Sequence, residues 1–298
     1  MKSIIQRQCP ALIVLLFGCL LQISCSHGSY TSPESYDLNR PVKMQLGKVL
    51  NEISGLSFNK NNNAILAISD SKPKVIQIDL KSNKLKDYTG AVVPPKQDLE
   101  DIVKLDSNLY LLASRGVIYS VPIYTKNNAG IKTFAFRPEE VNEFETLYYD
   151  SAANGLMMLC KNCAGDKGAK AHSAFRFDLT SNTFDAMPYY LIDVKAVRAV
   201  LKDKNAEFKP SAAAIHPIEK RLYILASVGK LLVIADTYGK VQEVHKLNPD
   251  IYRQPEGITF APNGDMFISN EAKGLVPTLL YFPYHVSNKQ TNEEDEKE

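Results

Sequence analysis

Residues 254–271 read QPEGITFAPNGDMFISNE and decide the fold, because weaker copies of this stretch recur upstream. Two short runs rich in β-branched and aromatic residues, 258–260 and 266–268, lie on either side of Asn263 and Gly264. Such runs predict strands, and an Asn-Gly pair between them predicts a tight hairpin turn. The repeating unit is therefore a β-hairpin that opens on a polar residue, here Glu256.

Four further copies open on Glu52, Glu100, Glu145 and Ser211, and each has a second apolar run downstream: 64–68, 109–113, 155–159 and 221–225. The intervals between the opening residues of the five copies are 48, 45, 66 and 45 residues. A period near 45 residues is typical of a propeller blade of four strands. Third and fourth strands are predicted after the hairpins, at 75–79 and 85–88 and again at 231–235 and 241–244.

The chain is thus predicted to be all-β, a single β-propeller of four-stranded blades. Five blades are favoured, and a sixth within the 66-residue interval is the alternative. The last copy ends after a third strand at 278–282, whereas residues 42–46 form a strand without a hairpin partner. We expect this early strand to close the last blade, which protects sheet edges that would otherwise stay open.

The propeller domain is predicted to span residues 40–286, with a flexible tether at 26–39 before it and a disordered acidic tail at 287–298 after it. The long interval contains a polar loop at 164–170 and a helical pattern at 191–201 with Asp193 as a candidate cap. Extended loops on a rigid scaffold often carry function, and a purely structural insertion is the alternative.

The net charge is small. With 35 Lys and Arg against 33 Asp and Glu, the formal charge is +2, and no basic run is interleaved with aromatic residues. These features exclude nucleic acid as an expected partner. We expect a monomer that binds an unidentified small ligand or an envelope protein.

The first 25 residues are predicted to be a signal peptide, because Lys2 and Arg7 precede an apolar run at 11–23. The sequence around Cys25 resembles a bacterial lipoprotein signal, in which the cysteine becomes the acylated first residue of the mature chain. Cys19 is a competing match, and a plain secreted protein is a further alternative. The polar segment after Cys25 favours that residue. A lipid anchor implies attachment to a membrane of the bacterial cell envelope, which we expect to be Gram-negative, with the protein on its periplasmic or surface face.

Only Cys160 and Cys163 remain in the mature domain. A local disulfide, free thiols, and a metal or redox site are the three interpretations of this C-x-x-C pair. Zinc would need two further ligands, and His172 is the single nearby candidate.

In an antiparallel hairpin, the residue that opens the first strand lies beside the residue that closes the second. If the first strands line the propeller axis, these polar pairs meet at one mouth of the channel. The pairs are Glu52 with Asp70, Glu100 with Arg115, Glu145 with Lys161, Ser211 with Ser227, and Glu256 with Asn270 or Glu271, and Asp101 lies next to Glu100.

Three interpretations of this mouth stay open. The glutamates could join neighbouring blades through hydrogen bonds to backbone N–H groups, as a structural latch. They could instead form a ligand or metal site, for which a hard cation such as Ca²⁺ is suited to carboxylate oxygens. The third interpretation, a catalytic site, has the least support, because the sequence has no Ser-His-Asp order and no dense metal-ligand motif.

The ordered motifs resemble those of the SdiA-regulated (YjiK-like) β-propeller family over residues 40–284. They are EISGL at 52–56, DLEDI at 98–102, FETLY at 144–148, PSAAAI at 210–215, QPEGITF at 254–260 and ISNE at 268–271. The resemblance implies a cell-envelope location and a link to calcium. Because it carries the Cys160–Cys163 pair, the chain looks like the lipoprotein members of the family from Bacteroidetes-type bacteria. Ser211 departs from the glutamate pattern, which argues against a symmetric metal ring.

Two function classes follow. The first is a non-enzymatic envelope propeller that binds a ligand, a metal or a protein at the glutamate-rich mouth, and this class is favoured. The second is a calcium-dependent hydrolase of lactonase or phosphoesterase type, which rests on analogy with other propellers.

Overall fold

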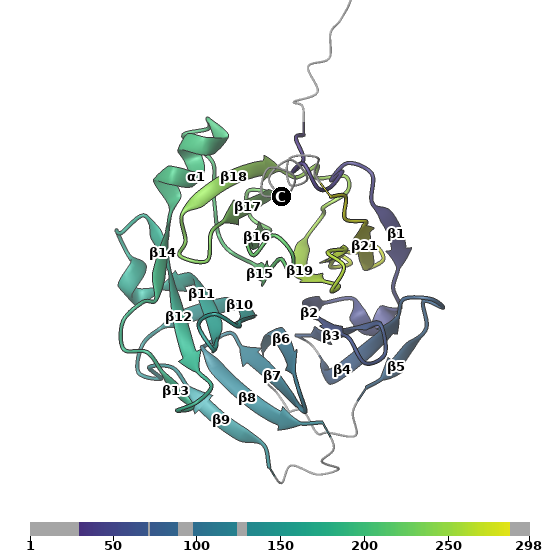
Figure 1. The fold of residues 1–298 in the computed structure, drawn as a ribbon, viewed down its shortest axis with the longest axis horizontal. Coiled ribbons are helices and arrows are strands. Elements are labelled where there is room, and N and C mark those ends of the chain that lie inside the picture. The colour runs from purple at the N-terminus through teal and green to yellow at the C-terminus, as the bar shows by residue number, and fades with distance from the viewer. Residues whose placement is uncertain (1–29, 71, 89–97, 124–129, 287–298) are drawn as a thin grey trace, which may run out of the picture.

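The computed structural model describes residues 30–70, 72–88, 98–123 and 130–286. Its strands form five antiparallel sheets around a common centre, so the protein is a five-bladed β-propeller (Figure 1). The all-β fold and the favoured blade count are confirmed. The predicted signal peptide, Cys25 and the predicted tail lie outside the described residues.

The blades follow one another along the chain, and each has its first strand nearest the centre (Figure 1). Blade 1 contains β2 Ile53–Asn59, β3 Ala64–Ser69, β4 Lys72–Asp79 and β5 Leu85–Asp87. Blade 2 contains β6 Leu99–Leu105, β7 Asn108–Ala113, β8 Val117–Pro122 and β9 Lys132–Ala135. Blade 3 contains β10 Asn142–Asp150, β11 Gly155–Cys163, β12 Ala171–Asp178, β13 Thr183–Phe184 and β14 Tyr190–Asp193. Blade 4 contains β15 Ala212–Ile215, β16 Leu222–Ala226, β17 Leu231–Ala235 and β18 Val241–Lys246.

Blade 5 is built from both ends of the described chain. Its strands are β19 Pro255–Phe260, β20 Met266–Asn270 and β21 Thr278–Phe282, and its outermost strand is β1 Val42–Gln45. β1 pairs antiparallel with β21, with Val42 opposite Tyr281. The predicted closure by the early strand is confirmed, and it covers the edge of β21.

The 66-residue interval holds no sixth blade, because β13 and β14 both pair with β12 and extend blade 3. The predicted helix is present as α1 Val194–Leu201, and the Asp193 side chain accepts a hydrogen bond from Lys195 N at 2.7 Å, as expected of an N-cap. Short 3₁₀ turns occur at Lys48–Leu50 and Ala164–Asp166. The buried face of α1 packs on blades 3 and 4.

The core is divided into five clusters, one between each pair of neighbouring blades. On β3, Ile65 and Ala67 contact blade 5, whereas Leu66 and Ile68 contact blade 2. Because side chains alternate along a strand, a strand between two blades must be apolar on both faces. This explains the continuous apolar runs that the sequence shows at the second strand of each blade.

Residues 30–39 pack against the propeller, so the predicted tether is wrong for this part of the segment. Tyr36 and Leu38 are 3% and 2% exposed and belong to the cluster between blades 4 and 5. The Tyr36 hydroxyl donates to Gly264 O at 2.6 Å, and the Tyr252 hydroxyl donates to Leu38 O at 2.9 Å. In the part of the chain that the structure describes, no helix has the length and apolar character needed to cross a membrane.

Candidate functional site

Four of the five innermost strands carry one extra residue, and in three of them it is a glutamate. In blade 2, Leu99 pairs with Ala113 and Asp101 pairs with Leu112, which leaves Glu100 as the extra residue. Glu145 in blade 3 and Glu256 in blade 5 are skipped in the same way. A β-bulge of this kind turns the extra side chain out of the regular alternation. The three glutamates therefore occupy one equivalent position at the start of their strands.

In blade 1 the extra residue is Ser54 or Gly55, which both lie between Ile53 and Leu56, and Ser54 is the one with a side chain to place at this position. Glu52 lies two residues earlier and its side chain is exposed. The prediction that Glu52 is equivalent to the other glutamates is therefore wrong by two residues. The position of a bulge depends on how two strands pair, and the sequence does not show it. In blade 4, which has no bulge, Ser211 is the equivalent residue.

These positions meet at one end of the propeller axis around a cavity of about 220 Å³. Its lining residues are Ser54, Asp70, Glu100, Glu145, Lys161, Ser211, Gln254, Glu256 and Glu271, and we call this set the acidic mouth. The structure thus brings together Asp70, Glu100, Glu145, Lys161, Glu256 and Glu271 of the predicted site. Ser54 and Gln254 were missed, because a serine and a glutamine at the start of a strand give no chemical signal.

Four predicted residues do not line the mouth: Glu52, Asp101, Arg115 and Asn270. Arg115 is exposed in a tight turn, in which Gly116 N donates to Ala113 O at 2.9 Å. Its neighbour Ser114 instead lies beside the start of β6, where Ser114 N donates to Asp98 O at 3.0 Å. Asn270 is buried, and its Nδ2 donates to Ile251 O at 3.1 Å.

Asp101 joins two blades. It is 4% exposed, its Oδ2 accepts a hydrogen bond from Leu147 N in blade 3, and its Oδ1 accepts one from Ile102 N. Burial raises the pKa of Asp101 well above its usual range, and the two backbone N–H donors oppose this change. A latch of the kind considered for the glutamates is therefore present, one residue further along the strand.

Burial raises the pKa of four carboxyl groups in the acidic mouth. The pKa of Glu100 rises to about 9, first through burial and then through the charge of Glu145. The pKa values of Glu145, Glu256 and Glu271 rise to about 7, each chiefly through burial. Neighbouring carboxylates add to this, as Glu271 does for Glu256. The cluster therefore retains protons near neutral pH.

Lys161 is the only basic residue among the described residues that line the mouth. It forms ion pairs with Glu145 and, at 3.4 Å, with Glu143. Burial on its own would lower the pKa of Lys161, but the hydrogen bond and charge of Glu145 outweigh burial, so this pKa is raised. One lysine facing five carboxyl groups leaves a cavity with excess negative charge whenever those groups ionise.

The opposite end of the axis has the opposite charge. A second cavity, of about 400 Å³, is lined by the later residues of the five inner strands and by Lys60, Lys104 and Lys220. Among the described residues that line it, none is acidic. The cavity at the start of the inner strands is therefore rich in acidic groups and the cavity at their end in basic groups, so a cation is favoured at the first end only.

Cys160 and Cys163 form a disulfide, which agrees with one of the three predicted interpretations. Together with Asp166 they are the one set of three potential metal ligands, among the described residues, whose ligand atoms lie within 4.8 Å of one another. Zinc binds cysteine as the thiolate, and sulfur atoms joined in a disulfide are not thiolates, so this pair is not a zinc site. His172 adds no ligand, because its Nδ1 and Nε2 lie 2.9 and 2.8 Å from Cys160 O and Phe208 O.

The fold and site define a class: a five-bladed propeller with carboxyl groups from several blades gathered at one end of its axis. A family model described as SdiA-regulated matches residues 31–282, and the chain belongs to that family. A search of curated proteins finds no match.

Solved structures share the architecture. Glutaminyl cyclase from Myxococcus xanthus aligns with a TM-score of 0.54 and 14% identity, covering 84% of this chain and 99% of that one. Apo-form soluble aldose sugar dehydrogenase from Escherichia coli aligns with a TM-score of 0.52 and 11% identity, covering 83% and 100% of the two chains. At these identities the likeness is one of fold alone.

Proposed function

We propose that this protein is a non-enzymatic binding module of the cell envelope whose acidic mouth binds a divalent cation, with Ca²⁺ as the expected ion. The observation that carries the proposal is the single cavity of about 220 Å³ that five carboxyl groups and one lysine line. Carboxylates placed this close together favour a cation, and Ca²⁺ takes six to eight oxygen ligands.

The donor set fits a hard cation. Asp70, Glu100, Glu145, Glu256 and Glu271 offer carboxylate oxygens, and Ser54, Ser211 and Gln254 offer neutral ones. As the side chains lie, no three carboxylates of the mouth have oxygens within 4.8 Å of one another. The glutamates would therefore turn inward or share the ion with water, and moderate affinity is expected of such an open site.

Protons compete with the ion. Because the pKa values of Glu145, Glu256 and Glu271 are about 7, a bound cation must displace protons from these groups at neutral pH. Affinity for the cation should thus increase with pH, and binding should release protons.

The envelope location rests on the leader sequence and on the family resemblance. We propose that Cys25 is acylated and anchors the protein to a membrane of a Gram-negative envelope, with the propeller as a monomer on the periplasmic or surface side. A small ligand or an envelope protein that carries or completes the metal site would then be its partner.

A calcium-dependent hydrolase is the second candidate, because a carboxyl group with a pKa near 7 is suited to general acid–base catalysis. Among the described residues that line the mouth there is no histidine, and the hydroxyls of the two serines donate to backbone carbonyls, Ser211 Oγ to Pro255 O at 3.0 Å and Ser54 Oγ to Glu52 O at 3.5 Å. These features favour binding over hydrolysis.

The two candidates are separated by one experiment. The purified protein would be analysed for bound metal and then assayed against lactones and phosphoesters in EDTA and in millimolar Ca²⁺. The binding module predicts metal without turnover. Turnover that requires Ca²⁺ and is lost in Glu145→Gln would replace the proposal with the hydrolase, and absence of both metal and Ca²⁺ binding would overturn both candidates.

A further inference from the structure

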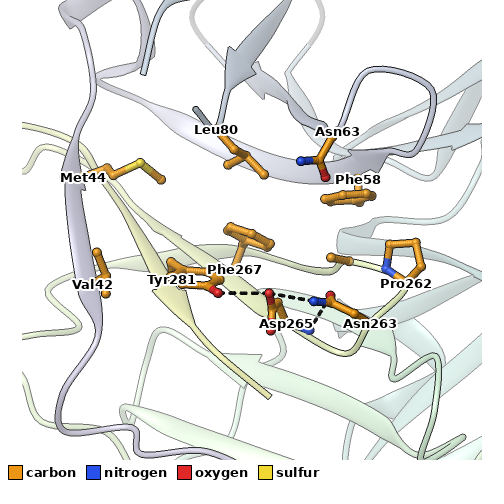
Figure 2. Close-up of a pocket in the computed structure, with 11 residues that line it drawn as sticks. Val42, Met44, Phe58, Asn63, Leu80, Pro262, Asn263, Asp265, Phe267 and Tyr281 are labelled. Carbon is orange, nitrogen blue, oxygen red and sulfur yellow. Dashed lines mark hydrogen bonds between the residues drawn. The ribbon is translucent and has the colours of Figure 1, made fainter. Parts of the chain in front are cut away.

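A third cavity lies at the seam where the propeller closes, and we call it the seam pocket (Figure 2). Its volume of about 530 Å³ is in the range of about 300–1,000 Å³ that small-molecule sites usually have. Three parts of the chain line it: β1 with Val42 and Met44, blade 1 with Phe58, Asn63 and Leu80, and blade 5 with residues from Ala261 to Tyr281.

Aromatic rings form much of the wall. The Phe267 and Tyr281 ring centroids are 5.2 Å apart, and the Phe58 and Phe267 centroids are 6.2 Å apart with their planes 28° from parallel. Figure 2 shows Phe58 and Leu80 on one side of the pocket and Phe267 and Tyr281 on the other. Met44 adds a polarizable thioether at one end.

Asp265 is the one charged residue among the described residues that line the seam pocket. Its Oδ2 accepts hydrogen bonds from the Tyr281 hydroxyl and from Asn263 Nδ2, both at 3.0 Å, and its Oδ1 accepts one from Tyr284 N at 2.9 Å. All three donors are neutral. The pocket therefore combines aromatic surfaces with a fixed carboxylate whose charge no lining residue balances.

We propose that the seam pocket binds a small organic ammonium ion that carries apolar substituents. The faces of aromatic rings attract an ammonium group, the Asp265 carboxylate supplies the opposite charge, and the aliphatic wall accommodates the apolar part. A neutral molecule of the same shape loses the first two interactions, and an anion is repelled by Asp265.

The position of the pocket gives the ligand a structural effect. Because β1, blade 1 and blade 5 all contribute to the wall, a bound molecule contacts both sides of the closure. A ligand that binds only the closed, folded propeller should therefore raise the melting temperature of the protein.

The test uses methionine methyl groups as reporters in the full protein. Met44 lines the pocket, whereas Met187 is 73% exposed and lies in blade 3, so its methyl signal is an internal control. The protein, labelled with ¹³C in its methionine methyl groups, would be titrated with choline and with 3,3-dimethylbutan-1-ol, a neutral molecule of the same shape. The Met44→Leu variant assigns the signal.

Choline is expected to shift the Met44 signal and leave that of Met187 in place, with an affinity at least tenfold above that of the neutral alcohol. Asp265→Asn should remove this preference, and Phe58→Leu should weaken choline binding several-fold. Asp236→Asn is the matched control, because Asp236 holds a turn of blade 4 through Tyr238 N and Lys240 N. Its response should equal that of the wild type.

The response should also be the same in EDTA and in saturating Ca²⁺, because the acidic mouth is a separate cavity. An unmoved Met44 signal, equal affinities for choline and the alcohol, or undiminished choline binding in Phe58→Leu would overturn the proposal. The comparison of the two ligands on wild-type protein decides the matter even if Asp265→Asn does not fold.

Discussion

Asp101 Oδ2 accepts a hydrogen bond from Leu147 N at 2.7 Å, and this contact joins blade 2 to blade 3. Other short polar side chains make similar connections: Ser57 Oγ accepts from Lys104 N at 2.9 Å, and Thr259 Oγ1 accepts from Phe58 N at 3.1 Å. These contacts between blades are thus made by Asp101, Ser57 and Thr259, and the first of them lies directly beside Glu100.

Replacement of Asp101 should therefore lower the stability of the fold rather than the affinity of the acidic mouth for Ca²⁺. Asp101→Ala leaves the buried Leu147 N–H without a partner, and we expect a loss of about 1–3 kcal/mol in the free energy of unfolding. Urea denaturation of the variant and the wild type measures it. Asp98→Ala, at an exposed side chain close by, is the control and should change stability little. A stability equal to wild type in Asp101→Ala would show that the contact is dispensable.

Gly55 lies where the same latch leaves no room for a side chain. A Cβ atom at this position would be 2.4 Å from Asp101 Oδ1 and 2.5 Å from Asp101 Cα. We expect Gly55→Ala to lower the unfolding free energy by about 1–3 kcal/mol through overpacking. Gly165→Ala is the matched control, because nothing lies within 4 Å of its added Cβ. Equal melting temperatures for the two variants would contradict the close approach of the blades.

The sequence predicts the blades well because each one repeats a local pattern of two apolar runs and a turn. It predicts the mouth only in part. Whether Glu52 or Ser54 faces the axis depends on a bulge in the register of β2 and β3, and hydrogen bonding between strands fixes that register. Residues 30–39 show no periodic pattern, so the burial of Tyr36 could not be foreseen. The seam pocket gives no local signal, because its walls come from opposite ends of the chain.

The pH dependence of stability follows from the raised pKa values in the mouth. Glu100, Glu145, Glu256 and Glu271 bind protons more tightly in the folded state than in the unfolded state, so their contribution to stability is full below about pH 4.5 and is lost as pH rises through about 7 to 9. In EDTA the melting temperature should therefore fall from pH 6 to pH 9. Glu145→Gln should reduce the fall, and a flat profile for the wild type would contradict the electrostatic description.

The anchor is tested by cell fractionation. If Cys25 is acylated, Cys25→Ala should release the protein from the membrane fraction, whereas Cys19→Ala should leave it there. Equal retention of both variants would reject Cys25 as the anchor, and release of both would point to a defect in export.

The most direct test of the account is calorimetric titration of Ca²⁺ into the wild type, Glu145→Gln, Glu256→Gln and Glu52→Gln at pH 6, 7 and 8. We predict that the wild type binds Ca²⁺ more tightly as pH rises, with proton release visible as heats that depend on the buffer. Glu145→Gln and Glu256→Gln should lose at least tenfold in affinity, whereas Glu52→Gln, which lies outside the cavity, should stay within about twofold of the wild type. No Ca²⁺ binding by the wild type, or equal binding by all four proteins, would contradict the cation site at the acidic mouth.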